Sequence, residues 1–376
     1  MMAVTLGAYV ARRFAVAVLA MLVALTGLVA LFDFIELLRR AATRPDADFA
    51  LVASIASMRL PFVALQIMPF AVLLGGMIAF WRLTRSSELI VARAAGISAW
   101  GFLVGPLMVA LALGLFGIMA LSPISAALLA RAERLDNAYL RAGGGVSALA
   151  SGRLWLRQAD HGFEPRGVAI LSGRPAAEIG SPVPRRAASF RMTDVTVWRL
   201  SAADRPLQRI EAPEARLEAG KWALSSALVF GADRSAHPQP LVELPTDLTP
   251  DRIEDSFATP DTLSFWALPG FITVLEEAGF SAVRHRLQFQ SLLSLPLLSA
   301  AMALLAAGFS MRPARRGGVA QMIGAGVAVG FALFVLDRIS GELGEAGTLP
   351  VVLAAWAPAL AGLMLALALL LHLEDG

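Results

Sequence analysis

The stretch FAVAVLAMLVALTGLVALF, residues 14–32, runs for 19 residues without a charged side chain. A helix of about 20 apolar residues spans the hydrocarbon core of a bilayer, which is about 30 Å thick. The stretch therefore predicts a transmembrane helix. Five further uncharged stretches of at least this length follow, and the sequence predicts six transmembrane helices in all. These stretches are 60–81, 94–130, 287–311, 317–336 and 346–371.

The composition of the whole chain agrees with a membrane protein. Of its 376 residues 57% are hydrophobic and 16% are charged, and the mean hydropathy is +0.66, whereas soluble domains are about 25% charged. This composition excludes a secreted enzyme, a cytosolic enzyme and a disordered protein. Arg12 and Arg13 precede a span of full length with no small-residue cleavage site, so we expect no cleavable signal peptide. The chain has no cysteine, which excludes disulfides and thiolate metal sites.

The predicted fold class is an α-helical integral membrane protein with an inserted β-jelly-roll-like domain. Helices one to three fall in residues 1–130, a polar insert occupies 131–285, and helices four to six fall in 286–376. Residues 131–286 hold 19 basic and 19 acidic side chains, so the remaining 13 basic and 10 acidic ones supply the net charge of +3. The high isoelectric point therefore reflects arginines that flank helices, and we expect no nucleic-acid partner.

The insert has the alternation of β-strands. RLWLR at 153–157 and FRMTDVTVW at 190–198 alternate polar and apolar residues, which places one face of a strand on a core and one in water. Further strands are expected at about 206–218 and 220–230, in a sandwich or an open jelly roll. Residues 262–278 predict an amphipathic helix, capped by Asp261 or Thr262.

Arginines near the helix ends predict the orientation in the membrane, because short cytoplasmic loops carry more basic residues. With the N-terminus inside, eight arginines are cytoplasmic and five are external. We therefore expect both termini in the cytoplasm and the β domain on the opposite side of the membrane. The cytoplasmic set is Arg12, Arg13, Arg82, Arg85, Arg93, Arg312, Arg315 and Arg316, and the external set is Arg39, Arg40, Arg44, Arg59 and Arg338.

The sequence offers no catalytic motif. The four histidines have no paired metal spacing, and the single Gly-Lys pair, at 220–221, lacks the pattern of a phosphate-binding loop. We predict no enzyme activity, no cofactor and no metal in this chain. Gly326 and Gly330 form a GxxxG pair inside a span, which is typical of close helix packing. Because no span centre holds an ionisable residue, any transport must take its energy from another chain.

The predicted cytoplasmic loop 82–98 is a candidate docking element. Ser86 or Ser87 can cap a short helix there, Gly96 can end it, and Glu88 is its one acidic residue. A short amphipathic helix with a lone carboxylate can be held by a motor subunit through a charged pair. A solvated connector with an incidental glutamate is the alternative.

The outer end of the first predicted span is a second candidate site. Residues 33, 36 and 40 lie on one helical face, because side chains three and four apart are neighbours. Arginines above an apolar stripe suit a lipid with phosphate groups, since guanidinium binds phosphate in a bidentate manner. Interfacial snorkelling with local Glu–Arg pairs is the alternative. The residues concerned are Asp33, Glu36, Arg39, Arg40 and Arg44.

Several segments resemble the lipopolysaccharide-export permease family LptF/LptG. The likeness covers nearly the whole chain, is strongest over 60–100, and looks more like the LptG member of the family than LptF. The segments that carry it are LFDFIELLRR (31–40), MPFAVLLGG (68–76), RSSELIVARAAGIS (85–98), RRGG (315–318) and LAAWAP (353–358).

The resemblance implies a bacterial inner membrane protein with its β domain in the periplasm, and it also implies partners and site residues. It implies a second, LptF-like permease, an LptB-like ATPase dimer that hydrolyses ATP, and the periplasmic bridge proteins LptC and LptA, which receive lipopolysaccharide for the outer membrane. It places Ser87, Glu88, Arg93 and Gly96 in a coupling helix at about 84–97, and it places Arg39, Arg40 and Arg44 against lipid phosphates. Many members have a basic residue where this chain has Gln290, so the resemblance assigns that position no role.

The residues alone leave two other functions open. The chain could export another amphiphile, such as a lipoprotein or a glycolipid precursor. It could also be a membrane-anchored scaffold whose β domain binds a periplasmic partner without transport. An associated ATPase distinguishes transport from a scaffold, and the mass of a co-purified lipid distinguishes one cargo from another.

Overall fold

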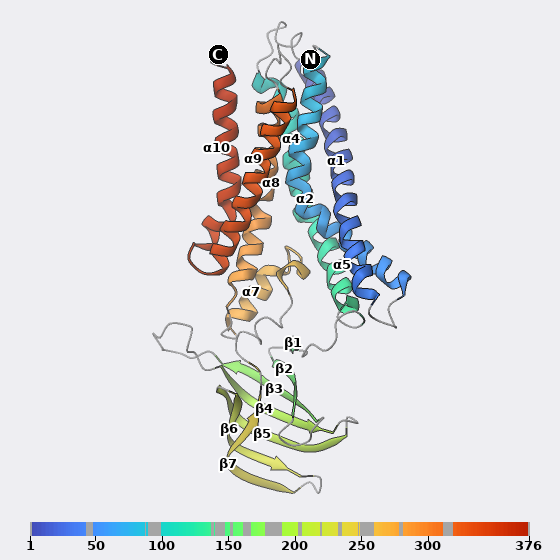
Figure 1. Ribbon diagram of the computed structural model, residues 1–376. Coiled ribbons are helices and arrows are strands. Elements are labelled where there is room, and N and C mark those ends of the chain that lie inside the picture. The colour runs from blue at the N-terminus through green and yellow to red at the C-terminus, as the bar shows by residue number, and fades with distance from the viewer. Residues whose placement is uncertain are drawn as a thin grey trace. The chain divides into compact units, whose positions relative to one another are not determined.

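A computed structural model gives the fold in two compact units, each of which is described by itself (Figure 1). The helical unit comprises Met1–Ala142, Pro260–Pro269 and Val283–Gly376, and the β unit comprises Gly143–Thr259 and Gly270–Ala282. The residues that the structure describes are 2–42, 48–86, 88, 99–136, 139, 147–150, 153–160, 167–176, 190–201, 205–218, 220–231, 235–246, 248, 259–277, 281–310 and 319–374.

The described residues contain six helices long and apolar enough to cross a membrane, as predicted. The third span is composite, because a π-helical turn, Gly117–Leu121, joins its two parts. Both termini lie at one end of the helical unit (Figure 1), where Thr84 Oγ1 near the end of α2 donates to the carbonyl of Ser310, the last residue of α8, at 3.3 Å. The spans are α1 (Met2–Ala41), α2 (Phe49–Arg85), α4 (Ala99–Phe116) with α5 (Ser122–Leu135), α8 (Val283–Ser310), α9 (Val319–Glu345) and α10 (Val351–Glu374).

Four of the other spans, α2, α4, α9 and α10, pack against α8, and α1 packs against α2 and α4. Of the six spans, α8 has the largest buried share, 72% of its apolar window, whereas the value is 17% for α1 and 22% for α9. Glycine permits the closest approaches. A Cβ on Gly114 would lie 2.4 Å from Cα of Pro296, so α4 and α8 touch there backbone to backbone. The helical unit therefore has one buried span and two spans with broad exposed apolar faces.

The β unit confirms the predicted β domain between the third and fourth spans. Its described strands form one antiparallel sheet in which each strand pairs with the next along the chain. The two-sheet sandwich that the alternation also allowed is therefore not formed. The strands are β1 (Ser147–Ala150), β2 (Arg153–Ala159), β3 (Val168–Ala176), β4 (Arg191–Leu200), β5 (Pro206–Glu218), β6 (Lys221–Phe230) and β7 (Ala236–Pro245).

The sheet curls until the end of β7 meets β2. Gln158 on β2 donates to the carbonyl of Pro245 on β7 at 2.9 Å and accepts from the Thr246 hydroxyl at 2.6 Å, although four strands separate β2 from β7 in the sheet. The apolar side chains thus face inward, and Trp222 is fully buried among them. Leu275 of α7 (Leu268–Glu277) joins this core.

The amphipathic helix before the fourth span begins later than predicted. The sequence pattern predicts 262–278 with Asp261 or Thr262 as cap, but α7 starts at Leu268 and a short 3-10 turn, Pro260–Thr262, precedes it. Pro269 gives the physical reason. Proline has no N–H and clashes with the carbonyl four residues before it, so in a helix interior it costs about 3 kcal/mol, whereas the first turn accepts it. A helix of ten residues, as α7 is, has few bonds to offset that cost, and it starts beside Pro269.

Candidate functional site

The C-terminal end of α1 carries a trio of ion-paired side chains. Glu36 accepts two hydrogen bonds from Arg39, both at 2.8 Å, and one from Arg40 at 2.9 Å. The side chain of Arg39 is 75% exposed and that of Arg40 is 43% exposed. The trio has a formal charge of +1, so it keeps an exposed positive charge while the carboxylate binds both guanidinium groups.

A second ion cluster joins three helices beside this trio. Arg59 on α2 bonds to Asp33 on α1 at 3.1 Å and to Asp136, just after α5, at 3.3 Å. Only 2% of the Asp136 side chain and 18% of the Arg59 side chain are exposed. Charges removed from water to this extent need partners. The ends of α1, α2 and α5 that lie opposite the chain termini are therefore held together by charge, which the sequence did not predict.

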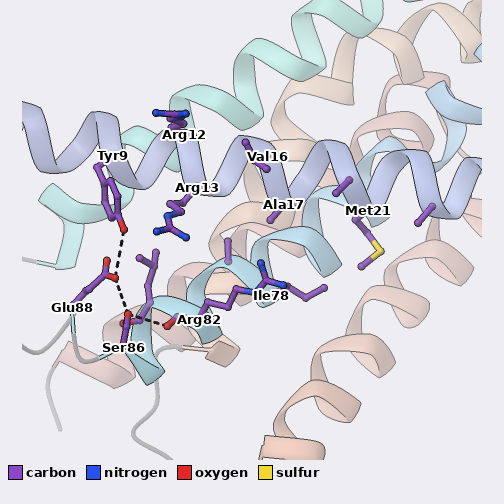
Figure 2. Close-up of a pocket in the computed structure, with 14 residues that line it drawn as sticks. Tyr9, Arg12, Arg13, Val16, Ala17, Met21, Ile78, Arg82, Ser86 and Glu88 are labelled. Carbon is purple, nitrogen blue, oxygen red and sulfur yellow. Dashed lines mark hydrogen bonds between the residues drawn. The ribbon is translucent and has the colours of Figure 1, made fainter.

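Glu88 lies at the opposite end of α1 and α2. Its carboxylate accepts a hydrogen bond from the Ser86 hydroxyl at 2.9 Å and a long one from the Tyr9 hydroxyl at 3.5 Å. Ser86 also donates to the carbonyl of Arg82 at 3.1 Å. Figure 2 shows Tyr9 and Arg13 pointing from α1 toward Ser86 and Glu88. The predicted docking carboxylate is thus tethered to the first helix as well as to the end of α2.

These side chains border a hollow of about 780 Å³ between α1 and α2. Arg12, Arg13 and Arg82 line it together with Tyr9, Ser86 and Glu88. Arg13 lies over the Tyr9 ring, 5.2 Å from its centroid, within the range of a cation–π contact. The remaining wall is apolar and consists of Val16, Ala17, Ala20, Met21, Ala24, Ile78, Ala79 and Leu83.

A smaller cavity of about 300 Å³ lies between α2, α8 and α9. Its wall is mostly apolar, but Gln66, Ser291 and Asp337 also line it, together with Asp261 of the 3-10 turn. Burial and the carboxylates of Glu133 and Glu345 raise the pKa of Asp261 to about 6. This cavity was not predictable from the sequence, because its polar residues come from four separate segments and form no motif.

Some predicted site residues lie outside the part of the chain that the structure describes. These are Ser87, Arg93 and Gly96 of the expected coupling helix and Arg44 of the expected lipid contacts. Of the expected coupling helix at about 84–97, the structure describes 84–86 and Glu88. Glu88, Arg39 and Arg40 are described, and they lie at opposite ends of the helical unit.

The glycine pair of α9 lies against α2. A Cβ on Gly326 would lie 2.5 Å from Cε of Met77, and one on Gly330 would lie 2.3 Å from Cδ2 of Leu73. These glycines let side chains of α2 approach the backbone of α9. Gln290 has a partner of its own, because its side-chain oxygen accepts from Trp356 Nε1 on α10 at 3.0 Å.

Comparison with known proteins identifies the family. The model of the lipopolysaccharide export system permease family LptF/LptG matches residues 8–372. The chain belongs to the LptF/LptG family. It is 26% identical over 362 residues to the lipopolysaccharide export system permease protein LptG of Escherichia coli, covering 94% of this chain and 93% of that protein. It is 24% identical over 361 residues to LptG of Haemophilus influenzae, covering 95% of each.

Membership of the LptF/LptG family confirms the resemblance that the sequence segments carry. The match includes both helical triplets and the β insert. A member of this family is a permease component of a transporter and not itself a catalyst. With six apolar spans, this LptF/LptG chain is a multi-pass inner membrane protein.

Proposed function

We propose that the chain is the LptG-type permease subunit of an ATP-driven exporter of lipopolysaccharide. The observation that carries this proposal is the family match over residues 8–372, which takes in both triplets and the insert. Both termini and Glu88 face the cytoplasm, and the β unit lies in the periplasm. The excess of arginines at the Glu88 end supports this orientation.

The proposed partners divide the work of export. An LptB-like ATPase dimer binds the loop around Glu88 and supplies energy that this chain cannot obtain. An LptF-like permease packs against the exposed faces of α1 and α9, the two least buried spans. On α9, Ile323, Val327 and Phe331 are exposed at intervals of four residues, as a helix-docking face requires. LptC and LptA receive the lipid in the periplasm.

The structure supports a direct route for force through the permease. α2 runs from Phe49 to Arg85, a length of about 55 Å at 1.5 Å per residue. One end lies beside Glu88, and Arg59 near the other end is ion-paired to Asp33 on α1 and Asp136 after α5. A push on the cytoplasmic end of α2 therefore moves the outer ends of α1 and α5 with it. Pro61 and Pro69 inside α2 are the points where the helix can bend.

The outer arginines are proposed to bind the lipid during this movement. Arg39 and Arg40, together with Arg44, contact its phosphates, which explains why positive charge remains exposed at this end of α1. Burial contributes about 0.8 kcal/mol per CH₂, so extraction of a lipid with several acyl chains costs tens of kcal/mol if the chains pass through water. Cavities with apolar walls lower this cost by sheltering the chains during extraction.

The test is ATP-dependent lipid release by the complete complex, reconstituted in vesicles. We expect Glu88→Ala to lower release by at least tenfold, because the ATPase loses its contact with the permease. The matched control is Glu342→Ala, which removes an exposed glutamate of α9, 70% accessible, and should leave release unchanged. Full release by the Glu88→Ala complex would disprove the coupling role of this residue.

A further inference from the structure

The hollow between α1 and α2 has the features of a binding site for a single lipid. Arg12, Arg13 and Arg82 line one end of it, and alanines and other apolar side chains line the rest. The part of the chain that the structure describes offers no hydrogen bond or ion pair to these three guanidinium groups. Glu88 lies at the same end, but Ser86 and Tyr9 supply its hydrogen bonds. The end of the hollow is therefore strongly positive.

The positive end of the hollow lies at the depth of the lipid headgroups in the membrane. Tyr9 is 38% exposed and Trp100 is 37% exposed at this end of the helical unit, and exposed aromatic residues of this kind mark the interface between hydrocarbon and water. From Tyr9 to Ala24, both of which line the hollow, α1 advances about 22 Å. One leaflet of the hydrocarbon core is about 15 Å thick. The hollow is long enough to hold an acyl chain of that leaflet along α1.

We infer that this hollow binds an anionic phospholipid of the cytoplasmic leaflet. Arg13 and Arg82 bind its phosphate, Arg12 adds positive charge, and one acyl chain lies against Ala17, Ala20 and Ala24. Guanidinium groups recognise phosphate oxygens through paired, charge-assisted hydrogen bonds. Basic pockets between transmembrane helices on the cytoplasmic side bind such headgroups. This lipid is distinct from the exported one, which meets the opposite end of α1.

A lipid bound in this hollow lies next to Glu88, the proposed coupling residue. The phosphate site shares Tyr9 with the hydrogen bonds of Glu88, so a bound lipid fixes the side chains that hold the docking carboxylate. This consequence rests on the proposed function and orientation. The binding itself is measured without ATP or cargo, so its failure is distinguishable from a failure of the proposed function.

The experiment is native mass spectrometry of the purified full chain in an uncharged detergent. The chain is titrated with phosphatidylglycerol or with phosphatidylcholine of the same acyl chains, and bound lipid is read as added mass. We expect phosphatidylglycerol to bind at least tenfold more tightly. Arg13→Gln with Arg82→Gln should weaken it about tenfold or more, because each charge-assisted bond is of that order. Equal binding of the two lipids would overturn the proposal.

Two control variants locate the site. Arg85→Gln with Arg131→Gln removes two exposed arginines that do not line the hollow and should leave binding unchanged. Ala20→Phe fills the apolar part and should weaken lipid binding with the arginines intact. If inorganic phosphate displaces the lipid at equal concentration, or if Ala20→Phe has no effect, the hollow is an anion site only. An equal loss in the Arg85/Arg131 pair would indicate nonspecific charge attraction and also overturn the proposal.

Discussion

Arg59 shows how one residue joins elements that are distant in the sequence. Its guanidinium bonds to Asp33, 26 positions earlier, and to Asp136, 77 positions later. In the sequence, Arg59 is only one of the five arginines at the helix ends predicted to be external. Its partners were not predictable, because they depend on which helices are neighbours, and hydropathy does not determine that. By contrast, the Glu36–Arg39–Arg40 trio lies within one helix, and its spacing alone predicts it.

We expect Arg59→Met to destabilise the helical unit by on the order of 3 kcal/mol. The variant removes a countercharge from Asp136, whose side chain is 2% exposed, and breaking a buried ion pair from one side is costly. Thermal unfolding of the purified chain in detergent measures the change. Arg39→Ala is the control, because its side chain is 75% exposed, and its unfolding midpoint should stay at that of the parent. Equal midpoints for Arg59→Met and the parent would show that Asp136 does not depend on Arg59.

At the scale of elements, a close contact between α1 and α2 depends on one glycine. A Cβ on Gly75 would lie 2.5 Å from Cα of Val18 and 2.9 Å from the carbonyl oxygen of Ala17. Both atoms belong to the backbone of α1, so no side chain can move aside. We expect Gly75→Ala to push the helices apart and to cost about 1–3 kcal/mol of stability.

The matched control for this contact is Gly27→Ala in α1. No atom lies within 4 Å of the Cβ that this substitution would add, and alanine is the better helix former by roughly 0.8–1 kcal/mol. The two glycine-to-alanine changes should therefore shift the unfolding midpoint in opposite directions. A shift in the same direction would mean that helix propensity outweighs the contact between α1 and α2.

The turn Pro260–Thr262 should make the stability of the helical unit depend on pH. Burial and the carboxylates of Glu133 and Glu345 raise the pKa of Asp261 from 3.8 to about 6. Between pH 4 and 6 the folded chain holds a proton that the unfolded chain has lost, so stability falls as pH rises. Above pH 6 ionisation of Asp261 lowers the free energy of unfolding by on the order of 3 kcal/mol, because a shift of one pKa unit corresponds to about 1.4 kcal/mol.

Asp261→Asn tests this dependence because it keeps the size of the side chain and removes the charge. We expect the variant to match the parent near pH 4 and to be more stable above pH 6, as read from unfolding midpoints across this range. Asp48→Asn is the control, since Asp48 is an exposed N-cap of α2 and asparagine caps a helix equally well. A difference that stays constant from pH 4 to 7 would contradict the raised pKa.

Most helices and strands were predictable from the sequence. The exceptions are the full length of α1 and the irregularity at Asp194 in β4. Uncharged runs located the six spans, yet α1 extends from Met2 to Ala41, well beyond 14–32, because charged residues at a membrane surface continue the helix. The alternation predicted β5 and β6 closely. It did not predict the irregularity at Asp194, which has a φ of 53° and shifts the buried positions from Met192 to Val195. A backbone kink of this kind leaves little trace in a hydropathy pattern.

At the scale of the molecule, the two ends of the helical unit carry opposite kinds of site. One end holds Glu88 and a positive hollow whose arginines have no carboxylate partner among the described residues. The other holds arginines that are ion-paired with Glu36, Asp33 and Asp136. Helices α1 and α2 extend from one to the other. This polarity agrees with the proposed orientation, in which the two ends of the helical unit face different compartments.

The orientation is testable because the chain has no cysteine, so each introduced thiol is the sole site for a maleimide. Gln239→Cys places one on the exposed strand β7, and Arg85→Cys places one at the exposed end of α2 near Glu88. In intact cells, a reagent that crosses the outer but not the inner membrane should label the first variant. The second variant should react only after the inner membrane is permeabilised. The reverse pattern would put Glu88 on the side that has no ATP, and no cytoplasmic ATPase could then drive this permease through it.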